Sequence, residues 1–199
     1  MTILEDVAQK NKKHAIKHDY WEKNGIKFSR VPLPVGDYIL LTDKVKDVID
    51  RKEKRGIALK KMDFLGTYNV CVDSKFDIQE IVGNLCGKSH ERFRDECILA
   101  QNNGIKLYVL VENKGGLIPK TNGIYNPTIT KLDDLHSWKN PRLFLWRNGK
   151  QLYPTATRGE RLQKICYTMQ AKYGCEFIFC TPEESGKKII ELLGGAKNG

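Results

Sequence analysis

Two short motifs carry side chains that could together hold a metal ion. In the first, Val72-Asp73-Ser74-Lys75 closes an apolar run, so that Asp73 and Lys75 stand two positions apart. Side chains two apart on a strand project from one face, which places a carboxylate and an ammonium in one site while Ser74 points away. In the second, Gly36-Asp37 opens another apolar run. Pairing of these two strands would bring the carboxylate of Asp37 within reach of Asp73.

Two carboxylates at one place suit a hard divalent cation, which takes oxygen ligands. We therefore predict a site for Mg²⁺, which Mn²⁺ can replace, with Asp37 and Asp73 as ligands and the backbone carbonyl of Ser74 as a further oxygen. Such a cation neutralises charge on a phosphate and lowers the pKa of bound water, while Lys75 would orient the water or stabilise the transition state. Each motif alone is common in turns or at solvated strand ends, so the prediction depends on both together.

The elements that must position these residues alternate between strands and helices. Lys75 leads directly into a helix in which Asp77 can act as N-cap and Glu80 can close a capping box. The order of elements predicts one α/β domain over residues 1–199, with a mixed central sheet, a three-strand meander within it, and helices on both faces. Predicted strands cover residues 2–5, 26–31, 38–41, 69–75, 105–112 and 176–180, and predicted helices cover 10–23, 77–87, 89–103, 157–174 and 181–194.

Two stretches interrupt this order and are predicted to be insertions. Residues 43–63 are mostly charged, which indicates a mobile insertion or a long hairpin arm. Residues 113–156 shift in composition to Gly, Pro, Asn and Thr. Within them a hairpin is predicted over Leu143–Tyr153, turning at Asn148-Gly149, because Asn-Gly favours the tight turn of a two-residue hairpin loop.

Basic and aromatic side chains in these stretches are candidate contacts for a polyanion. Residues 43–63 hold eight basic side chains against five acidic ones, although a solvated surface explains this composition equally well. Trp138 and Trp146 could stack on unpaired bases or form a subunit contact, with ordinary packing as the simpler interpretation for Trp138. The basic candidates are Lys52, Arg55, Arg92, Arg94, Arg147 and Lys150.

The bulk composition favours polyanionic partners without choosing among them. Lysine and arginine number 34 against 24 aspartates and glutamates, for a net charge of +10. This excess attracts DNA, RNA or an anionic membrane surface alike. No apolar run approaches the roughly 20 residues that cross a bilayer, and the N-terminus lacks the apolar stretch of a secretory signal, so we expect a cytoplasmic protein. The six cysteines show no CxxC or CxxH pairing, which favours buried reduced thiols.

The order and context of the motifs resemble the XPF-type nuclease domain, a branch of the PD-(D/E)xK restriction-endonuclease-like superfamily. The similarity is to its compact single-domain members from bacteria and their phages. It implies a metal-dependent DNA endonuclease with Asp37 and Asp73 as metal ligands and Lys75 as the catalytic lysine. Relatives act on branched or flapped DNA and commonly dimerise, so a structure-selective homodimer is a further implication. The matching stretches are LPVGDYIL, VCVDSKFDIQEIVGNLCGKSHERFRDECILAQNNGIKLYVLVEN and TATRGERLQKICYTMQAKYGCEFIFCTPEESGKKII.

This sequence departs from the family pattern at three places. Family members usually carry Glu-Arg-Lys, whereas this sequence has Asp73-Ser74-Lys75. Four residues after the lysine the family usually has an acid, whereas this sequence has Gln79. Near the N-terminus, the family's Asp-Thr-Arg-Glu is replaced by residues that include Asp6 and Gln9, which we predict as second-tier site residues. The stretch Asp50-Arg51-Lys52 matches the family triplet more literally, but no predicted amphipathic helix follows it.

Two other functions remain compatible with these residues. A catalytically weak or inactive DNA-binding or scaffolding module of the same fold would bind DNA with a steep salt dependence and lack a divalent-ion site. A restriction enzyme of the superfamily would cut at specific sequences. Asp37, Asp73 and Lys75 are all present, which favours the active enzyme.

Overall fold

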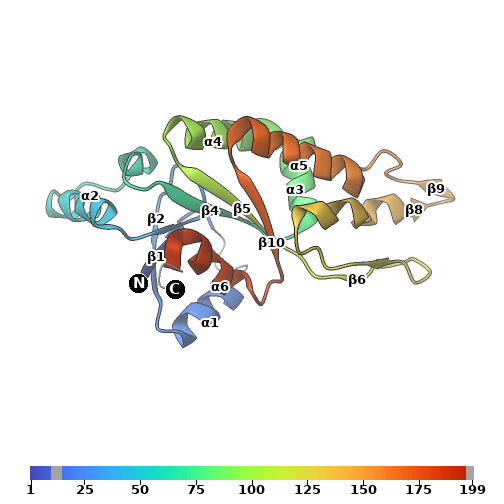
Figure 1. Cartoon of the computed structure of the whole chain (residues 1–199), viewed down its shortest axis with the longest axis horizontal. Helices are drawn as coiled ribbons and strands as arrows, with labels where there is room; N and C mark the ends of the chain where they lie inside the picture. Colours follow the sequence, from blue (N-terminus) through green and yellow to red (C-terminus); the bar gives the residue numbers. More distant parts are fainter. Residues whose placement is uncertain (10–14, 196–199) are drawn as a thin grey trace.

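The computed structural model of the chain describes residues 1–9 and 15–195. Its centre is a mixed six-stranded sheet with the order β10-β5-β4-β3-β1-β2 (Figure 1). Within this sheet, β3 runs opposite to its neighbours β1 and β4, while the other pairs are parallel. One edge therefore gathers the carboxyl ends of five strands and the start of β3. The strands are β1 (Thr2–Asp6), β2 (Lys27–Val31), β3 (Tyr38–Leu40), β4 (Val70–Lys75), β5 (Lys106–Glu112) and β10 (Glu176–Cys180).

The position of β1 corrects the predicted meander. The meander would pair residues 26–31 directly with residues 38–41, but β1 lies between them, parallel to β2 and antiparallel to β3. Ile3 and Leu4 are both buried although successive strand residues face opposite ways, so β1 is covered on both faces. β2 has mostly exposed or partly buried residues, which suits the edge position that it takes.

Helices cover both faces of the sheet, as expected (Figure 1). α3, α4 and α5 pack on one face, and α1 and α6 pack on the other around Trp21 and Tyr38. The predicted first helix begins at residue 10, but residues 10–14 lie outside the described part of the chain. None of the described helices is both long and apolar enough to cross a bilayer. The helices are α1 (Ala15–Lys23), α3 (Ile78–Cys86), α4 (His90–Asn102), α5 (Gly159–Tyr173) and α6 (Ser185–Ile190), which continues into a short turn, η5 (Glu191–Gly195).

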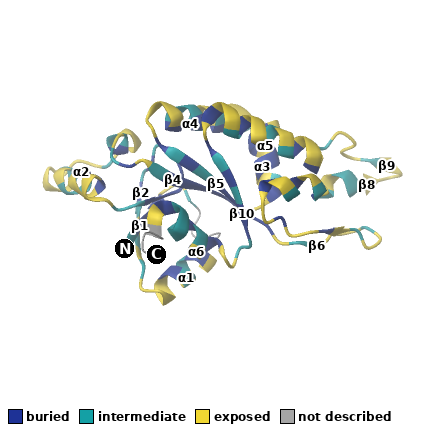
Figure 2. Ribbon diagram, in the orientation of Figure 1, coloured by how far each residue is buried: buried dark blue, intermediate teal, exposed yellow. Residues whose placement is uncertain are grey.

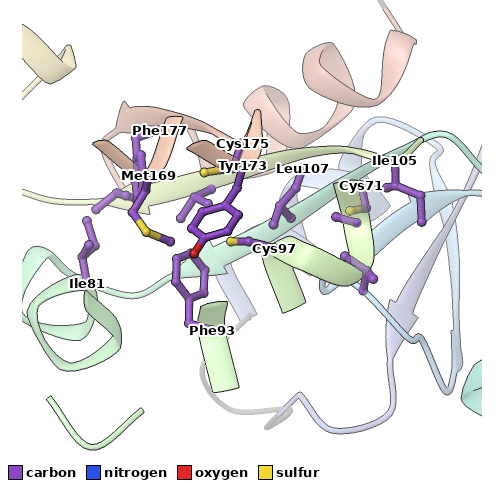
Figure 3. Packing of buried hydrophobic residues seen from close by; sticks show 14 of the residues in the cluster. Cys71, Ile81, Phe93, Cys97, Ile105, Leu107, Met169, Tyr173, Cys175 and Phe177 are labelled. Atoms are coloured by element: carbon purple, nitrogen blue, oxygen red, sulfur yellow. The ribbon is translucent and has the colours of Figure 1, made fainter. Parts of the chain in front are cut away.

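The larger hydrophobic core lies between the sheet and the layer of α3, α4 and α5 (Figure 3). Phe93 and Cys97 from α4 join Met169 and Tyr173 from α5 in this cluster. All six cysteines are free, and all but Cys86 are buried. The five buried cysteines are therefore core residues, and this core fixes α4 against the strands that carry the predicted site.

Residues 43–63 contain helical structure, so the predicted hairpin arm is wrong. α2 (Asp43–Lys54) begins at Thr42, whose hydroxyl accepts a hydrogen bond from the Val45 backbone N–H, and the short helix η2 (Lys61–Phe64) follows. Val45 and Val48 are buried, because residues three apart share one face of a helix. The many charges occupy the opposite, solvated face of an amphipathic helix rather than a loop.

Residues 113–156 contain short elements that extend beyond the sheet (Figure 1). The predicted hairpin is present, and its turn places Asn148 at φ 49° and Gly149 at φ 72°, as an Asn-Gly loop requires. Trp138 is 7% exposed within the core, whereas Trp146 is 63% exposed. The elements are β6 (Gly116–Leu117), β7 (Tyr125–Asn126), η3 (Leu132–Ser137), η4 (Pro141–Phe144), β8 (Trp146–Arg147) and β9 (Lys150–Gln151).

Candidate active site

The predicted site residues meet at the sheet edge where β1, β4 and β5 end and β3 begins. A cavity of about 610 Å³ opens there. The pairing of Tyr38 with Val72 joins β3 to β4, and the backbone N–H of Asp37 donates to the Val72 carbonyl at 2.8 Å. The inferred strand pairing that should bring Asp37 beside Asp73 is therefore present. The predicted residues that line the cavity are Asp6, Gln9, Asp37, Asp73, Ser74, Lys75 and Arg92.

Asp73 and Lys75 form a buried ion pair within this cavity. The Lys75 ammonium Nζ lies 2.8 Å from Oδ1 and 2.7 Å from Oδ2 of Asp73. Both side chains are less than a tenth exposed. Ser74 points to the other face, where its hydroxyl donates to the Glu112 carboxylate at 3.2 Å. The alternation expected from the strand is therefore observed.

The Gly36-Asp37 motif is fixed by close packing rather than being an ordinary turn. Gly36 has φ +73°, and a Cβ at this position would lie 2.8 Å from Cβ of Cys71. Its backbone N–H donates to the Glu96 carboxylate at 2.9 Å, and the Asp37 carboxylate accepts the Ser74 backbone N–H at 2.8 Å. A side chain at Gly36 would be strained and would push β3 away from β4.

In this site the carboxylates of Asp37 and Asp73 both interact with the positive charge of Lys75. Burial and then the charge of Asp73 raise the pKa of Asp37 well above its ordinary value. Burial lowers the pKa of Lys75, but Asp73 and Asp37 more than compensate, so this pKa lies above its ordinary value. Lys75 therefore stays protonated near neutral pH.

The second-tier residues Asp6 and Gln9 also lie at this edge. Asp6, the last residue of β1, accepts the Leu33 backbone N–H at 3.2 Å and donates its own backbone N–H to the Asp37 carbonyl at 2.8 Å. The Gln9 side-chain amide donates to Oδ1 of Asp37. Both residues therefore touch Asp37 and hold its backbone or carboxylate in place.

The predicted basic contacts divide between the cavity and more distant surfaces. Arg92, in the first turn of α4, lines the cavity. Arg94 instead pairs with Asp95 at 3.0 Å on the helix surface. The cavity lining does not include the remaining four candidates, of which Lys52 and Arg55 lie at the end of α2 and Arg147 and Lys150 lie in the β8–β9 hairpin.

The cavity lining also includes charged residues that were not predicted as site residues, among them Glu96, Glu112 and Lys17. Glu96 lies on α4 between Phe93 and Cys97, so its helical spacing places it on the face that packs against the sheet. Burial and the charge of Asp73 raise the pKa of Glu96 to about 7. Glu112 ends the apolar strand β5, and it forms a buried ion pair with Lys17 of α1. A charge on an otherwise apolar helix face or strand is the sequence signal that could have identified these residues.

The donor set at this edge fits a hard divalent cation. Asp73 Oδ2 accepts no well-oriented hydrogen bond from a described residue, although Lys75 Nζ is near it. Across the described ranges, no three histidine, cysteine, aspartate or glutamate side chains are grouped as a ready-made metal cage. Mg²⁺ does not need such a cage, because it is usually bound by one or two carboxylates together with water and substrate phosphates. Asp37 and Asp73 supply these two carboxylates.

Comparison with known proteins agrees with this geometry. The model of the ERCC4 domain family matches residues 7–193. The chain belongs to the ERCC4 domain family. It is accordingly an XPF-type nuclease domain with a restriction-endonuclease-like mixed sheet.

This ERCC4 domain is also similar in fold to a solved structure. XPF from Aeropyrum pernix, solved as a complex with DNA, matches with a TM-score of 0.52 and 14% sequence identity. The match covers 96% of this chain and 62% of that one, so this chain spans less than two thirds of the archaeal protein. At such low identity the match shows the fold. No curated protein matches the chain.

Proposed function

We propose that this ERCC4 domain is a divalent-metal-dependent DNA endonuclease that hydrolyses phosphodiester bonds with Mg²⁺ or Mn²⁺. One observation carries the proposal: strand pairing brings Asp37 to the cavity that holds the buried Asp73–Lys75 pair. Structural ion pairs do not need a second buried carboxylate whose pKa is raised by burial and by the charge of the first. Such an arrangement is costly for stability and useful for binding a cation.

In this proposal each residue at the edge has a distinct task. Asp37 and Asp73, with the backbone carbonyl of Ser74, hold the cation. When bound, the cation supplies charge neutralisation at the scissile phosphate and acidifies water. Lys75 is a charged donor that orients the attacking water or stabilises charge on the phosphate oxygens. Asp6, Gln9 and Glu96 position Asp37 and the preceding glycine through their hydrogen bonds.

DNA is the proposed substrate for three reasons. The net charge of +10 favours a polyanion. The family is one of XPF-type nucleases, and the matched Aeropyrum pernix protein of the same fold was solved with DNA. Arg92 at the cavity is the first candidate for a phosphate contact. Selectivity for branched or flapped DNA and a homodimeric state are family expectations that belong to this proposal.

The test is cleavage of labelled DNA by the purified chain and by Asp73→Asn. Flap, junction, duplex and single-stranded oligonucleotides are incubated with Mg²⁺, with Mn²⁺ and with chelator. We expect metal-dependent cutting by the parent and a loss of at least about 100-fold in Asp73→Asn, because the variant keeps the size of the side chain but loses the charge.

Asp95→Asn is the matched control, since Asp95 is an exposed aspartate that also borders the cavity. It should cut within about twofold of the parent. Robust cutting by Asp73→Asn contradicts the site, whereas DNA binding by the parent without any cutting favours an inactive binding module of the same fold.

A further inference from the structure

Positive charge is concentrated in the segment between β5 and α5. Residues 113–159 hold eight lysines and arginines against two aspartates, which is +6 of the net charge of +10. Neither aspartate lies beyond residue 134, so the following 25 residues contain no carboxylate side chain. The basic residues of this segment are Lys114, Lys120, Lys131, Lys139, Arg142, Arg147, Lys150 and Arg158.

The most exposed part of this segment is residues 142–153, which we name the basic–aromatic hairpin. Trp146 is 63% exposed and Tyr153 is 46% exposed, and Figure 2 shows the exposed surface of β8 and its turn. The guanidinium of Arg142 lies 5.7 Å from the centre of the Tyr153 ring. Exposed hydrophobic side chains that gather on one segment mark binding surfaces, whereas single scattered ones do not.

No carboxylate in the described part of the chain neutralises the cations of the hairpin. Among the described residues, no carboxylate lies within 4.0 Å of Arg142, Arg147 or Lys150, and the same criterion finds twelve ion pairs elsewhere. Lys52 on α2, by contrast, pairs with Asp63 at 3.0 Å. The hairpin charges are therefore available to external phosphates, whereas the charge of Lys52 is already compensated within the protein.

The hairpin is a defined platform rather than a loose loop. The Leu152 backbone N–H donates to the Leu145 carbonyl at 2.8 Å, and the Gln151 side-chain amide donates to the Leu143 carbonyl at 2.6 Å. Residues 113–159, which contain the hairpin, leave the sheet directly after Glu112, a residue that lines the cavity. Figure 1 shows the hairpin at the opposite end of the molecule from α2. A DNA strand that leaves the cavity toward this end would meet the hairpin.

We propose that the basic–aromatic hairpin binds an unpaired DNA segment of the substrate. Trp146 and Tyr153 stack on bases, while Arg147 and Lys150 contact the adjoining phosphates. An unpaired strand is favoured over a duplex because aromatic side chains stack on base faces, which neighbouring bases cover in a duplex. The inference rests on the proposed function only in taking DNA as the substrate, and it assigns this contact to a surface outside the cavity.

The experiment measures binding without catalysis, in chelator, by anisotropy of labelled single-stranded and duplex oligonucleotides. Trp146→Ala should weaken binding of the single strand by about 10-fold, and Trp146→Phe should keep most of the affinity because the ring can still stack. Binding of a blunt duplex should change by less than about twofold in both variants. The double variant Arg147→Ala/Lys150→Ala should reduce the slope of log affinity against log salt by about 1.4, which corresponds to two lost phosphate contacts.

A second readout uses the intrinsic fluorescence of the chain. Trp21 and Trp138 are buried, whereas Trp146 is exposed, so stacking on Trp146 should quench an emission component that is absent from Trp146→Phe. Equal single-strand affinity of Trp146→Ala and the parent overturns the inference. A change from dimer to monomer in Trp146→Ala, with unchanged affinity per subunit, also overturns it and identifies a subunit contact.

Metal-dependent cleavage of the same oligonucleotides by the parent and Asp73→Asn is scored separately. The proposed function fails if the parent does not cut, whatever the hairpin variants bind. The hairpin inference fails if Trp146→Ala binds like the parent, whether or not the parent cuts. The two failures are therefore distinguishable.

Discussion

The candidate active site at the sheet edge and the basic–aromatic hairpin differ in how their charges are compensated. At the edge, Asp73 and Lys75 are 3% and 7% exposed, and each lies against an opposite charge. In the hairpin, Trp146 is 63% exposed, and the neighbouring cations have no carboxylate within 4.0 Å in the described chain. Buried charges depend on the fold to compensate them, whereas solvated charges do not.

This difference predicts how each region responds to substitution. A change at the edge should alter stability and activity together, because the same contacts compensate the buried charges and prepare the site. A change in the hairpin should alter DNA binding alone, because water already solvates the side chains that are removed. Substitutions in the two regions should therefore separate effects on stability from effects on DNA binding.

The largest effect is expected from Lys75→Met, which keeps the length of the side chain and removes its charge. It leaves Asp73 and Asp37 without their shared cation, so the free energy of unfolding should fall by about 3 kcal/mol in chelator. Cleavage should fall by at least about 100-fold. Urea denaturation and the cleavage assay provide the two measurements.

Lys187→Met is the control for this change, because Lys187 is 66% exposed and lies in a surface pair with Glu191. Its unfolding free energy should change by less than about 1 kcal/mol. If Lys75→Met were as stable and as active as Lys187→Met, the buried pair would contribute to neither the free energy of unfolding nor cleavage.

An intermediate effect is expected from Glu96→Gln and depends on pH. The pKa of Glu96 is raised from 4.5 to about 7 in the folded chain, so its contribution to stability is full below pH 4.5 and is lost as the pH rises through 7. Glutamine does not titrate and can still accept the Gly36 N–H. The free energy of unfolding of the variant, relative to that of the parent, should therefore rise by on the order of 2 kcal/mol between about pH 5 and about pH 8 in chelator.

Glu91→Gln, at an exposed position of the same helix, should show a constant difference from the parent across that range. The measurement is urea denaturation at several pH values. A constant difference for Glu96→Gln as well would show that Glu96 does not share the electrostatics of the candidate active site.

The smallest effect on stability is expected from Trp146→Ala. Its side chain is mostly in water, so the free energy of unfolding, measured with heat or urea, should change by less than about 0.5 kcal/mol. Trp138→Ala makes the same substitution in the core and should cost about 3 to 5 kcal/mol. A large loss of stability in Trp146→Ala would mean that the hairpin is a structural element rather than an exposed binding surface.

The sequence predicted best what depends on neighbours in the chain. The shared face of Asp73 and Lys75 follows from strand alternation, and Asp77 caps the next helix at 2.7 Å as its position predicts. The Glu80 carboxylate accepts the backbone N–H of Phe76 at 2.9 Å, whereas the predicted capping box would use the N–H of Asp77. These local contacts concern residues within a few positions of one another.

The sequence predicted less well what depends on distant segments. The place of β1 between β2 and β3 is set by pairing across the sheet, and Glu96 reaches the site from a helix 60 residues after Gly36. The helix α2 was not predicted because most of its residues are charged. Its buried residues are Val45 and Val48, which alone are too few to give a clear helical pattern. Long-range packing decides these features, and a single sequence shows them only as weak patterns.

A calorimetric titration with Mn²⁺ of the parent, Asp73→Asn and Asp95→Asn, without DNA, tests the metal site directly. We expect saturable binding in the parent and Asp95→Asn, and at least about 10-fold weaker binding in Asp73→Asn. Equal affinity of Asp73→Asn and the parent would contradict the assignment of the candidate active site as the metal site.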